Sequence, residues 1–95
     1  MTALPSLWTI IIDFDGGTYL RQTSANSPSE ALRRCFQRLK RDAIPGISAT
    51  ELAKIRLAAR SEVPVTIRRL RSVYCATITV NDKLLLANLV CTKKR

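Results

Sequence analysis

The sequence contains no histidine among its 95 residues. Histidine is the commonest general base and metal ligand near neutral pH, so its absence removes the usual partner of a catalytic nucleophile. Cysteine is also scarce, since Cys35, Cys75 and Cys91 are the only three and form no C-x-x-C pair. Their odd number and irregular spacing argue against a disulfide framework and favour a reducing compartment. We therefore expect the cysteines to pack in the core, and we expect no cofactor and no metal.

Long hydrophobic runs are absent as well. The apolar run over residues 7–12 is preceded by no positive charge and is followed closely by Asp13 and Asp15. A signal peptide needs the positive charge, and a membrane span needs about 20 apolar residues. We therefore expect a cytoplasmic protein with no membrane partner.

Acidic residues are few. Seven Asp and Glu stand against sixteen Lys and Arg, which gives a formal net charge of +9. Such an imbalance favours an acidic partner, which is nucleic acid, an anionic membrane surface or an acidic protein, although a basic surface that only aids solubility fits equally well. The length predicts a single domain, residues 1–95, with a folded core over 5–92 and a basic tail over 93–95.

The first half of the chain predicts a β-hairpin followed by a helix. Residues 7–14 are rich in β-branched and aromatic side chains and are apolar on both faces, as in a central strand covered on both sides. Asp15-Gly16-Gly17 suits a tight turn, and residues 18–23 form the returning strand. Ser27-Pro28-Ser29-Glu30 then has the pattern of a capping box that begins a helix. The apolar stripe of this helix comprises Leu32, Cys35, Phe36 and Leu39.

The second half predicts another helix and a closing hairpin. Ser48 and Glu51 repeat the capping pattern, and the helix should end near Arg60. Residues 65–67 suit either a short edge strand or an extended connector. Residues 73–80 and 84–92 read as two strands joined by a turn at Asn81-Asp82. The register that gathers the apolar side chains on one face pairs Tyr74 with Leu89, Ala76 with Ala87 and Ile78 with Leu85.

Together these elements predict an α+β domain, with an antiparallel sheet in the order β-β-α-α-β-β and helices packed on the sheet. The second face of the closing hairpin is too apolar to remain in water. Either the second helix or another subunit should cover it, and we favour a homodimer. The candidate interface residues are Val73, Leu84, Leu86 and Val90.

One motif is similar to the first motif of haloacid-dehalogenase-type phosphatases, in which an apolar strand ends in Asp-x-Asp-Gly-Thr. Asp13 and Asp15 match the two carboxylates, but Gly17 separates Gly16 from Thr18 and shifts the spacing by one residue. That family also needs a parallel sheet, a downstream Lys and a late acidic pair for the metal. Here Asp42 and Asp82 are isolated, and the chain is too short for such a fold. A strand end followed by a turn explains both aspartates, so we expect no enzyme and no catalytic residues.

The basic residues suggest contact with nucleic acid. If they converge in space, they form a surface that follows phosphate groups. Tyr19 and Arg21 share one face of a strand, as in sheets that bind RNA, but the RRM signature, a helix-turn-helix and a zinc finger are all absent. The candidate binding residues form two groups: Arg33, Arg34, Arg38, Lys40 and Arg41, and then Arg68, Arg69 and Arg71.

Residues 7–41 resemble HicB-type antitoxins. The resemblance rests on an apolar strand, Asp13-x-x-Gly16, a second strand, and the helix start Ser27-Pro28-Ser29-Glu30-Ala31-Leu32. It implies pairing with a small RNA-cleaving toxin, oligomerisation and a C-terminal DNA-binding segment. The C-terminal half reads as a β-hairpin instead, so operator binding is not expected, whereas partner binding through a sheet edge or an exposed face is.

The sequence thus predicts a small non-enzymatic binding protein whose basic surface suits nucleic acid or another acidic partner. The alternative is a protein-interaction module, antitoxin-like or a homodimeric subunit.

Overall fold

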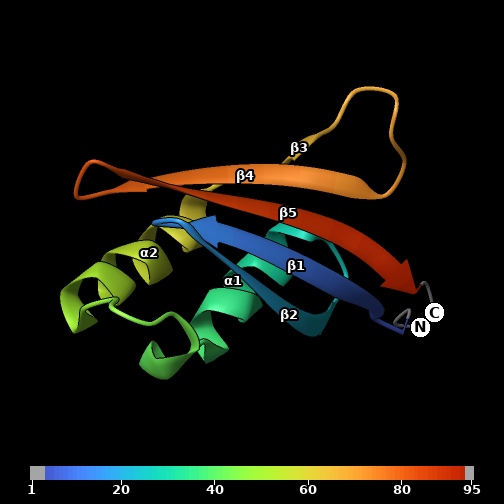
Figure 1. Cartoon of the computed structure of the whole chain (residues 1–95). Helices are drawn as coiled ribbons and strands as arrows, with labels where there is room; N and C mark the ends of the chain where they lie inside the picture. The colour runs from blue at the N-terminus through green and yellow to red at the C-terminus, as the bar shows by residue number, and fades with distance from the viewer. Residues whose placement is uncertain (1–3, 94–95) are drawn as a thin grey trace.

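The computed structural model describes residues 4–93 and shows an α+β fold (Figure 1). Its sheet is antiparallel, with the strand order β2-β1-β5-β4-β3. The elements are β1 (Ser6–Phe14), β2 (Gly17–Ala25), α1 (Pro28–Arg38), the short 3₁₀ turn η1 (Arg41–Ala43), α2 (Ala49–Ser61), β3 (Val65–Thr66), β4 (Val73–Val80) and β5 (Lys83–Lys93).

The predicted order β-β-α-α-β-β is incomplete, because a fifth strand precedes the closing hairpin. Val65 and Thr66 pair with Cys75 and Tyr74 and form β3 at the sheet edge. The limit of the predicted basic tail is also wrong, since Lys93 is the last residue of β5. Lys94 and Arg95 lie outside the described residues.

Both tight turns have the backbone that a two-residue hairpin requires. Asp15 and Gly16 have φ of 48° and 81°, and Asn81 and Asp82 have φ of 49° and 62°. Such positive φ angles match the twist of the flanking strands and are tolerated by Gly, Asn and Asp. The predicted register of the closing hairpin is confirmed, with Tyr74 opposite Leu89, and the other two pairs likewise.

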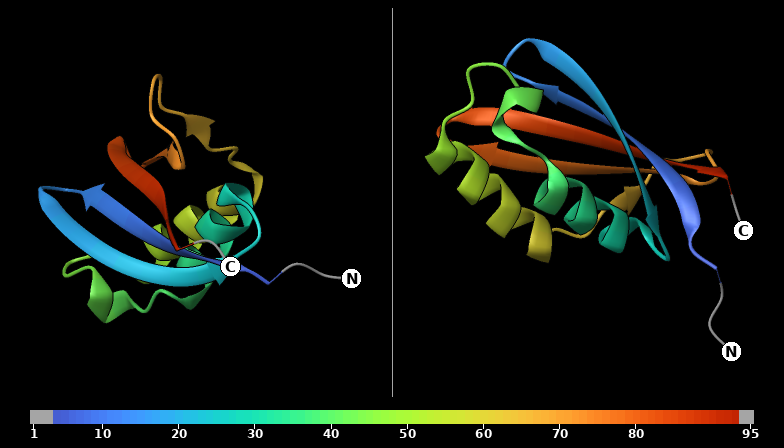
Figure 2. Two further views of the ribbon diagram at one scale, coloured as in Figure 1. Left: turned by 90° about the vertical axis from the view of Figure 1, so that its right-hand side faces the viewer. Right: turned by 90° about the horizontal axis from the view of Figure 1, so that it is seen from below.

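The helices lie on one face of the sheet only (Figures 1 and 2). The prediction that residues 7–14 are covered on both sides is therefore wrong, although β1 does lie between β2 and β5. Helix α2 also does not cover the outer face of the closing hairpin, as one of our two alternatives supposed. Since side chains alternate along each strand, one set faces the helices and the other does not.

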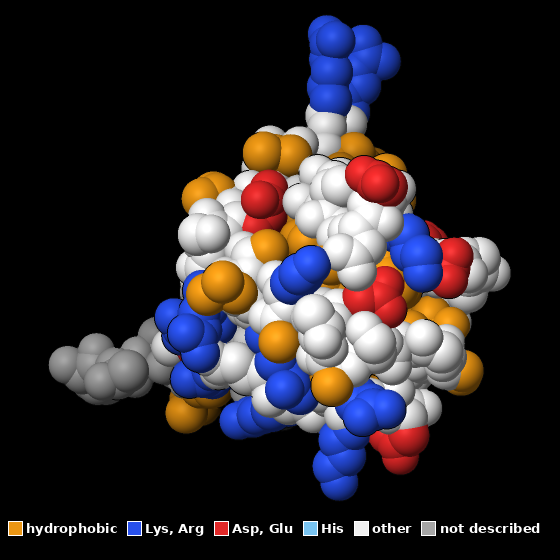
Figure 3. All heavy atoms as spheres, turned by 90° about the vertical axis from the view of Figure 1, so that its left-hand side faces the viewer, with side chains coloured by type: hydrophobic (Ala, Val, Ile, Leu, Met, Phe, Trp, Pro, Cys, Tyr) orange, Lys and Arg blue, Asp and Glu red, His pale blue; other side chains and the backbone are white. Residues whose placement is uncertain are grey.

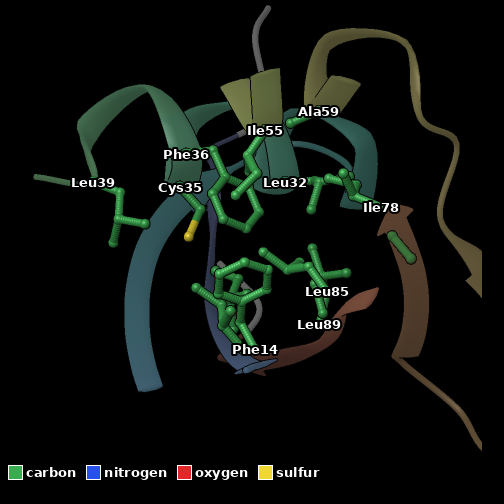
Figure 4. Close-up of a cluster of buried hydrophobic side chains, with 14 of the residues drawn as sticks. Phe14, Leu32, Cys35, Phe36, Leu39, Ile55, Ala59, Ile78, Leu85 and Leu89 are labelled. Carbon is green, nitrogen blue, oxygen red and sulfur yellow. The ribbon is translucent and has the colours of Figure 1, made fainter. Parts of the chain in front are cut away.

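The core lies between the sheet and the two helices. Ile10 and Ile12 of β1 and Leu85 and Leu89 of β5 are fully buried on the helix-facing side. Figure 4 shows Leu85 and Leu89 in one cluster with Leu32 and Phe36 of α1 and Ile55 of α2. Removing this apolar surface from water supplies most of the driving force for folding.

We call the other side of the sheet the open face. It is defined by the residues whose register sets them opposite one another away from the helices. These are Leu7, Thr9, Ile11 and Asp13 of β1; Thr18, Leu20, Gln22 and Ser24 of β2; Leu84, Leu86, Asn88, Val90 and Lys93 of β5; Val73, Cys75, Thr77 and Thr79 of β4; and Val65 of β3.

The two helix starts differ from each other in one detail. In α2 the capping box is complete, with Ser48 Oγ accepting from the Glu51 amide at 3.0 Å and Glu51 Oε1 accepting from the Ser48 amide at 3.1 Å. In α1, Ser27 Oγ accepts from the Glu30 amide at 3.1 Å, as predicted. The Glu30 carboxylate, however, lies 3.0 Å from Arg34, so the expected return bond to Ser27 is replaced by an ion pair.

The end of α1 is held by a side chain from α2. Arg56 Nε donates to the Phe36 carbonyl at 3.0 Å, and its Nη2 donates to the Leu39 carbonyl at 2.6 Å. The last carbonyls of a helix have no partner within the helix and carry partial negative charge, so a cation there is doubly favourable. Arg56 thus joins the two helices and serves the fold.

We expect Arg56→Gln to lower the free energy of unfolding by about 2 kcal/mol, because two charge-assisted bonds to part-buried carbonyls are lost. Urea denaturation followed by circular dichroism measures the change. Arg60→Gln, at an exposed position of the same helix, is the control and should change stability by less than about 0.5 kcal/mol. Equal losses in the two variants would contradict the role assigned to Arg56.

Candidate nucleic-acid interface

The first basic group follows α1 and the segment after it. Arg33, Arg38, Lys40 and Arg41 are exposed. Arg34 is only partly exposed, because it donates to the Ser24 carbonyl at 2.8 Å and pairs with Glu30. Arg34 therefore links α1 to β2 and is less available to a ligand than its neighbours.

The second basic group lies on the loop that joins β3 to β4, residues 67–72. Arg68, Arg69 and Arg71 are all exposed there. The loop is closed by backbone hydrogen bonds from the Ile67 amide to the Val73 carbonyl at 3.3 Å and from the Leu70 amide to the Ile67 carbonyl at 3.0 Å. The loop therefore holds its three guanidinium groups on a defined backbone.

This loop carries backbone strain. Arg69 has φ of 68° and Ser72 has φ of 59°, in the left-handed region that glycine favours. A non-glycine residue there costs about 1 kcal/mol. The bond from Leu70 to Ile67 closes a turn with Arg69 at its third position, where glycine is the usual residue. Strain of this kind clusters at functional sites, so the loop is the segment that most needs a functional explanation.

The two basic groups do not converge. The loop projects from the β3–β4 edge, away from the helices (Figure 1). In Figure 3 the Lys and Arg side chains gather in the lower part of the view and, separately, at the top, where they rise above the rest of the molecule. A single short ligand would not span both groups, so each must be considered as a separate surface.

Local carboxylates leave most of these cations free. Within residues 4–93 the ion pairs are Arg34 with Glu30, Lys83 with Asp15 and Lys83 with Glu51. Arg34 is thus the one candidate binding residue with a carboxylate partner in the described part of the chain. The other candidate residues keep their positive potential for an external anion.

A surface hollow of about 770 Å³ lies beside the first group, between Lys40, Arg41 and the start of α2. A helix start attracts anions when its amides are free. Here Ser48 Oγ occupies the Glu51 amide, and the Glu51 carboxylate adds negative charge at the same end. The hollow is therefore a poor site for a phosphate group.

Asp13 and Asp15 each have a local partner. Asp13 Oδ1 accepts from Thr18 Oγ1 at 2.6 Å, across the β1–β2 hairpin. Asp15 lies in the tight turn, 3.4 Å from Lys83, and Lys83 also lies 3.5 Å from Glu51. Antiparallel neighbours and a hairpin turn surround these carboxylates, which fits the explanation by a strand end and a turn. In residues 4–93 no three His, Cys, Asp or Glu side chains cluster as a metal would require.

The thiol of Cys35 is poorly suited to nucleophilic chemistry. Burial raises its pKa to about 11, against a smaller opposing influence of the Arg21 charge. It is therefore protonated at neutral pH, and the thiolate is the reactive form. Cys75 on the open face and Cys91 beside Trp8 are also free cysteines, so the described structure contains no disulfide. The prediction that the cysteines pack in the core is wrong for Cys75, which is half-buried on the open face.

The sheet does not offer a surface for stacking bases. Tyr19 and Arg21 pair with Ile12 and Ile10, so both lie on the helix-facing side. Trp8, Phe14 and Tyr74 also belong to that side, and the Trp8 and Tyr74 rings lie 5.7 Å apart. Among the described residues the open face thus carries no aromatic side chain, which RNA-binding sheets depend on.

The comparisons with known proteins give no information on function. No family model, no curated protein and no solved structure matches the chain. The resemblance to HicB-type antitoxins therefore stays a prediction. Within residues 4–93, neither helix has the length and hydrophobicity that crossing a membrane requires.

The pKa of Glu51, which pairs with Lys83, leads to a prediction about the pH dependence of stability. Hydrogen bonding from the Ser48 amide is the main cause that lowers the pKa of Glu51 below its ordinary value of 4.5, and the Lys83 charge adds to it. The unfolded chain then binds more protons than the folded one in acid, so the stabilisation is present above pH 4.5 and is lost as the pH falls through the lower folded pKa.

Glu51→Gln keeps the capping geometry and removes the titration. We expect the free energy of unfolding to fall less steeply below pH 4.5 in this variant than in the wild type. Urea denaturation at a series of pH values measures the two slopes. Parallel curves for the two proteins would show that Glu51 does not contribute to acid sensitivity.

Proposed function

We propose that this chain is a non-enzymatic binding protein that contacts the phosphate groups of nucleic acid through the loop of residues 67–72. The observation that carries the proposal is the loop itself. It presents three exposed arginines within four residues, on a strained and hydrogen-bonded backbone, with no carboxylate partner in the described part of the chain. Arginine suits this role because its planar guanidinium donates two parallel hydrogen bonds to one phosphate.

The rest of the molecule supports contact with the backbone of the nucleic acid and not with its bases. Nothing on the open face can stack on a base, and neither helix belongs to a recognisable reader of the major groove. Phosphate contacts orient a protein on nucleic acid and carry no sequence information. The proposed binding is therefore independent of sequence and sensitive to salt.

The first basic group serves as a second, weaker contact. Arg33 and Arg38 belong to a helix face that also carries the Glu30–Arg34 ion pair, so its positive potential is diluted. The position of this group away from the loop lets it reach a different part of a long or folded nucleic acid. An acidic protein remains the competing partner, and the experiment below separates the two.

Catalysis has little support among the groups available. Asp13 and Asp15 are occupied by Thr18 and Lys83, and Cys35 is a protonated thiol. The free cysteines also fit the proposal that the protein works in a reducing compartment such as the cytoplasm.

A salt titration with two matched triple variants tests the proposal. The loop variant is Arg68→Gln/Arg69→Gln/Arg71→Gln, and the control is Arg33→Gln/Arg38→Gln/Arg41→Gln. Each removes three charges from the net +9, so bulk electrostatics changes equally. Fluorescence anisotropy with random-sequence duplex DNA and with RNA measures affinity against salt. The loop variant should bind roughly 10- to 100-fold more weakly and lose about 2 to 3 units of salt slope.

The control variant should lose clearly less affinity than the loop variant. A loss in the control that equals or exceeds that of the loop variant would contradict the assignment to residues 67–72. Wild-type protein that binds neither nucleic acid at low salt would remove the proposal and leave an acidic protein as the partner.

A further inference from the structure

We propose that the open face is the surface through which two copies of this chain associate face to face. This inference develops the alternative prediction of a homodimeric interaction module. It does not rest on the proposed nucleic-acid contact, because it uses a different surface. The four candidate interface residues, Val73, Leu84, Leu86 and Val90, all belong to this face.

The open face differs in charge from the rest of the molecule. As defined above, it contains one Lys, Lys93 at its end, no Arg or Glu and a single Asp, whereas sixteen of the 95 residues of the chain are Lys or Arg. Asp13, the one acid, already accepts from Thr18. An acidic partner would bind the basic loop or α1. We therefore expect the partner that covers the open face to present few charges at the contact.

The open face of a second copy is such a surface with few charges. Two basic proteins repel each other wherever their charged surfaces meet. In one copy the helices lie behind the sheet (Figure 2), so when two open faces meet, the helices of both copies lie on the outside. The arrangement keeps the first basic group of each copy away from that of its partner, and it opposes apolar side chains to apolar side chains.

The total area of the open face is sufficient for a dimer. Leu20, Leu84 and Val65 on this face are 58%, 59% and 62% exposed, and a monomer would leave them in water. Four strands about 4.8 Å apart and about eight residues long cover roughly 500 Å² per copy. Two copies therefore bury roughly 1,000 Å², which is about the minimum for a specific interface.

Some polar groups of the face already have partners within the chain. Thr9 accepts from Gln22 Nε2 at 3.0 Å and is also hydrogen-bonded to Thr92. At the other end Asp13 Oδ1 accepts from Thr18. Polar groups with partners cost little to bury, whereas unpaired ones cost 1–3 kcal/mol each by a rough general rule.

Pairing along the sheet edge is the main competing mode of self-association. The long free edge is β2, and its middle residue is Arg21. A symmetric antiparallel pairing of two β2 strands about their midpoint would set the two Arg21 side chains opposite each other, and like charges there are destabilising. The opposite edge consists of the two-residue β3 and of residues 76–80 of β4, which β3 does not reach, so it is the shorter of the two edges. The face is therefore the better surface for a symmetric dimer.

Analytical ultracentrifugation tests the proposal on the full chain after nuclease treatment and in high salt, so that bridging by nucleic acid does not contribute. Wild type should sediment as a dimer that dissociates on dilution. Leu86→Lys and Leu84→Lys should both sediment as monomers with unchanged circular dichroism. Leu84 is already largely exposed, so this variant keeps the test valid if Leu86→Lys fails to fold. Leu57→Lys, the same substitution at a residue of α2 that is 65% exposed, is the control and should remain a dimer.

Cys75 supplies a probe for the location of the contact, because it is a partly exposed residue of the open face. In wild type its alkylation should slow at least several-fold from micromolar to near-millimolar protein, and in Leu84→Lys it should not change. Monomeric wild type over that range would overturn the proposal. A dimer that survives both variants, with Cys75 equally reactive at every concentration, would overturn it in favour of edge pairing.

Discussion

Because successive side chains of β1 and β5 point to opposite faces of the sheet, one pairing register decides what the helices can cover. With Ile10 opposite Leu89, and Ile12 opposite Ala87, the fully buried residues of both central strands lie under α1 and α2. A slip of one residue would expose this set and bury the open face instead. The position of every other functional surface follows from this register.

The register also separates the charged surfaces from the uncharged one. Helix α1 has two exposed basic residues, Arg33 and Arg38, and the loop of residues 67–72 extends beyond the sheet at the β3–β4 edge (Figure 1). The open face lies between them and has one cation, Lys93, at its end. Self-association through that face and contact with an acidic ligand through the loop are therefore compatible proposals, since neither uses the residues of the other.

The sequence predicted those features that depend on local patterns. Alternation of apolar residues gave the register of the closing hairpin, and the pairs Ser27–Glu30 and Ser48–Glu51 marked both helix starts. It missed β3 as a definite strand because two residues carry too little periodicity. It also predicted cover on both faces of β1 because Leu7 and Ile11 are apolar, although half-exposed apolar residues are common in a sheet with one free face.

The features that depend on topology could not be read from the sequence. Nothing local distinguishes Arg56, which binds the end of α1, from Arg60, which is exposed in the same helix. Whether the two basic groups meet depends on the direction in which the β3–β4 loop projects. The positive φ of Arg69 could not be predicted from the sequence, because the usual sequence signal for positive φ is a glycine. The side of the sheet on which Tyr19 and Arg21 lie became clear only from the pairing of β1 with β2.

Small-angle X-ray scattering of the nuclease-treated chain tests most directly the central claim that one sheet face is covered within the chain and the other by a second copy. The single chain has a Cα radius of gyration of 13.0 Å. A face-to-face dimer is compact, and a compact particle of twice the chain length has a radius of about 16 Å. The account predicts this value at high protein concentration. A radius that stays near 13.0 Å at every concentration would contradict it.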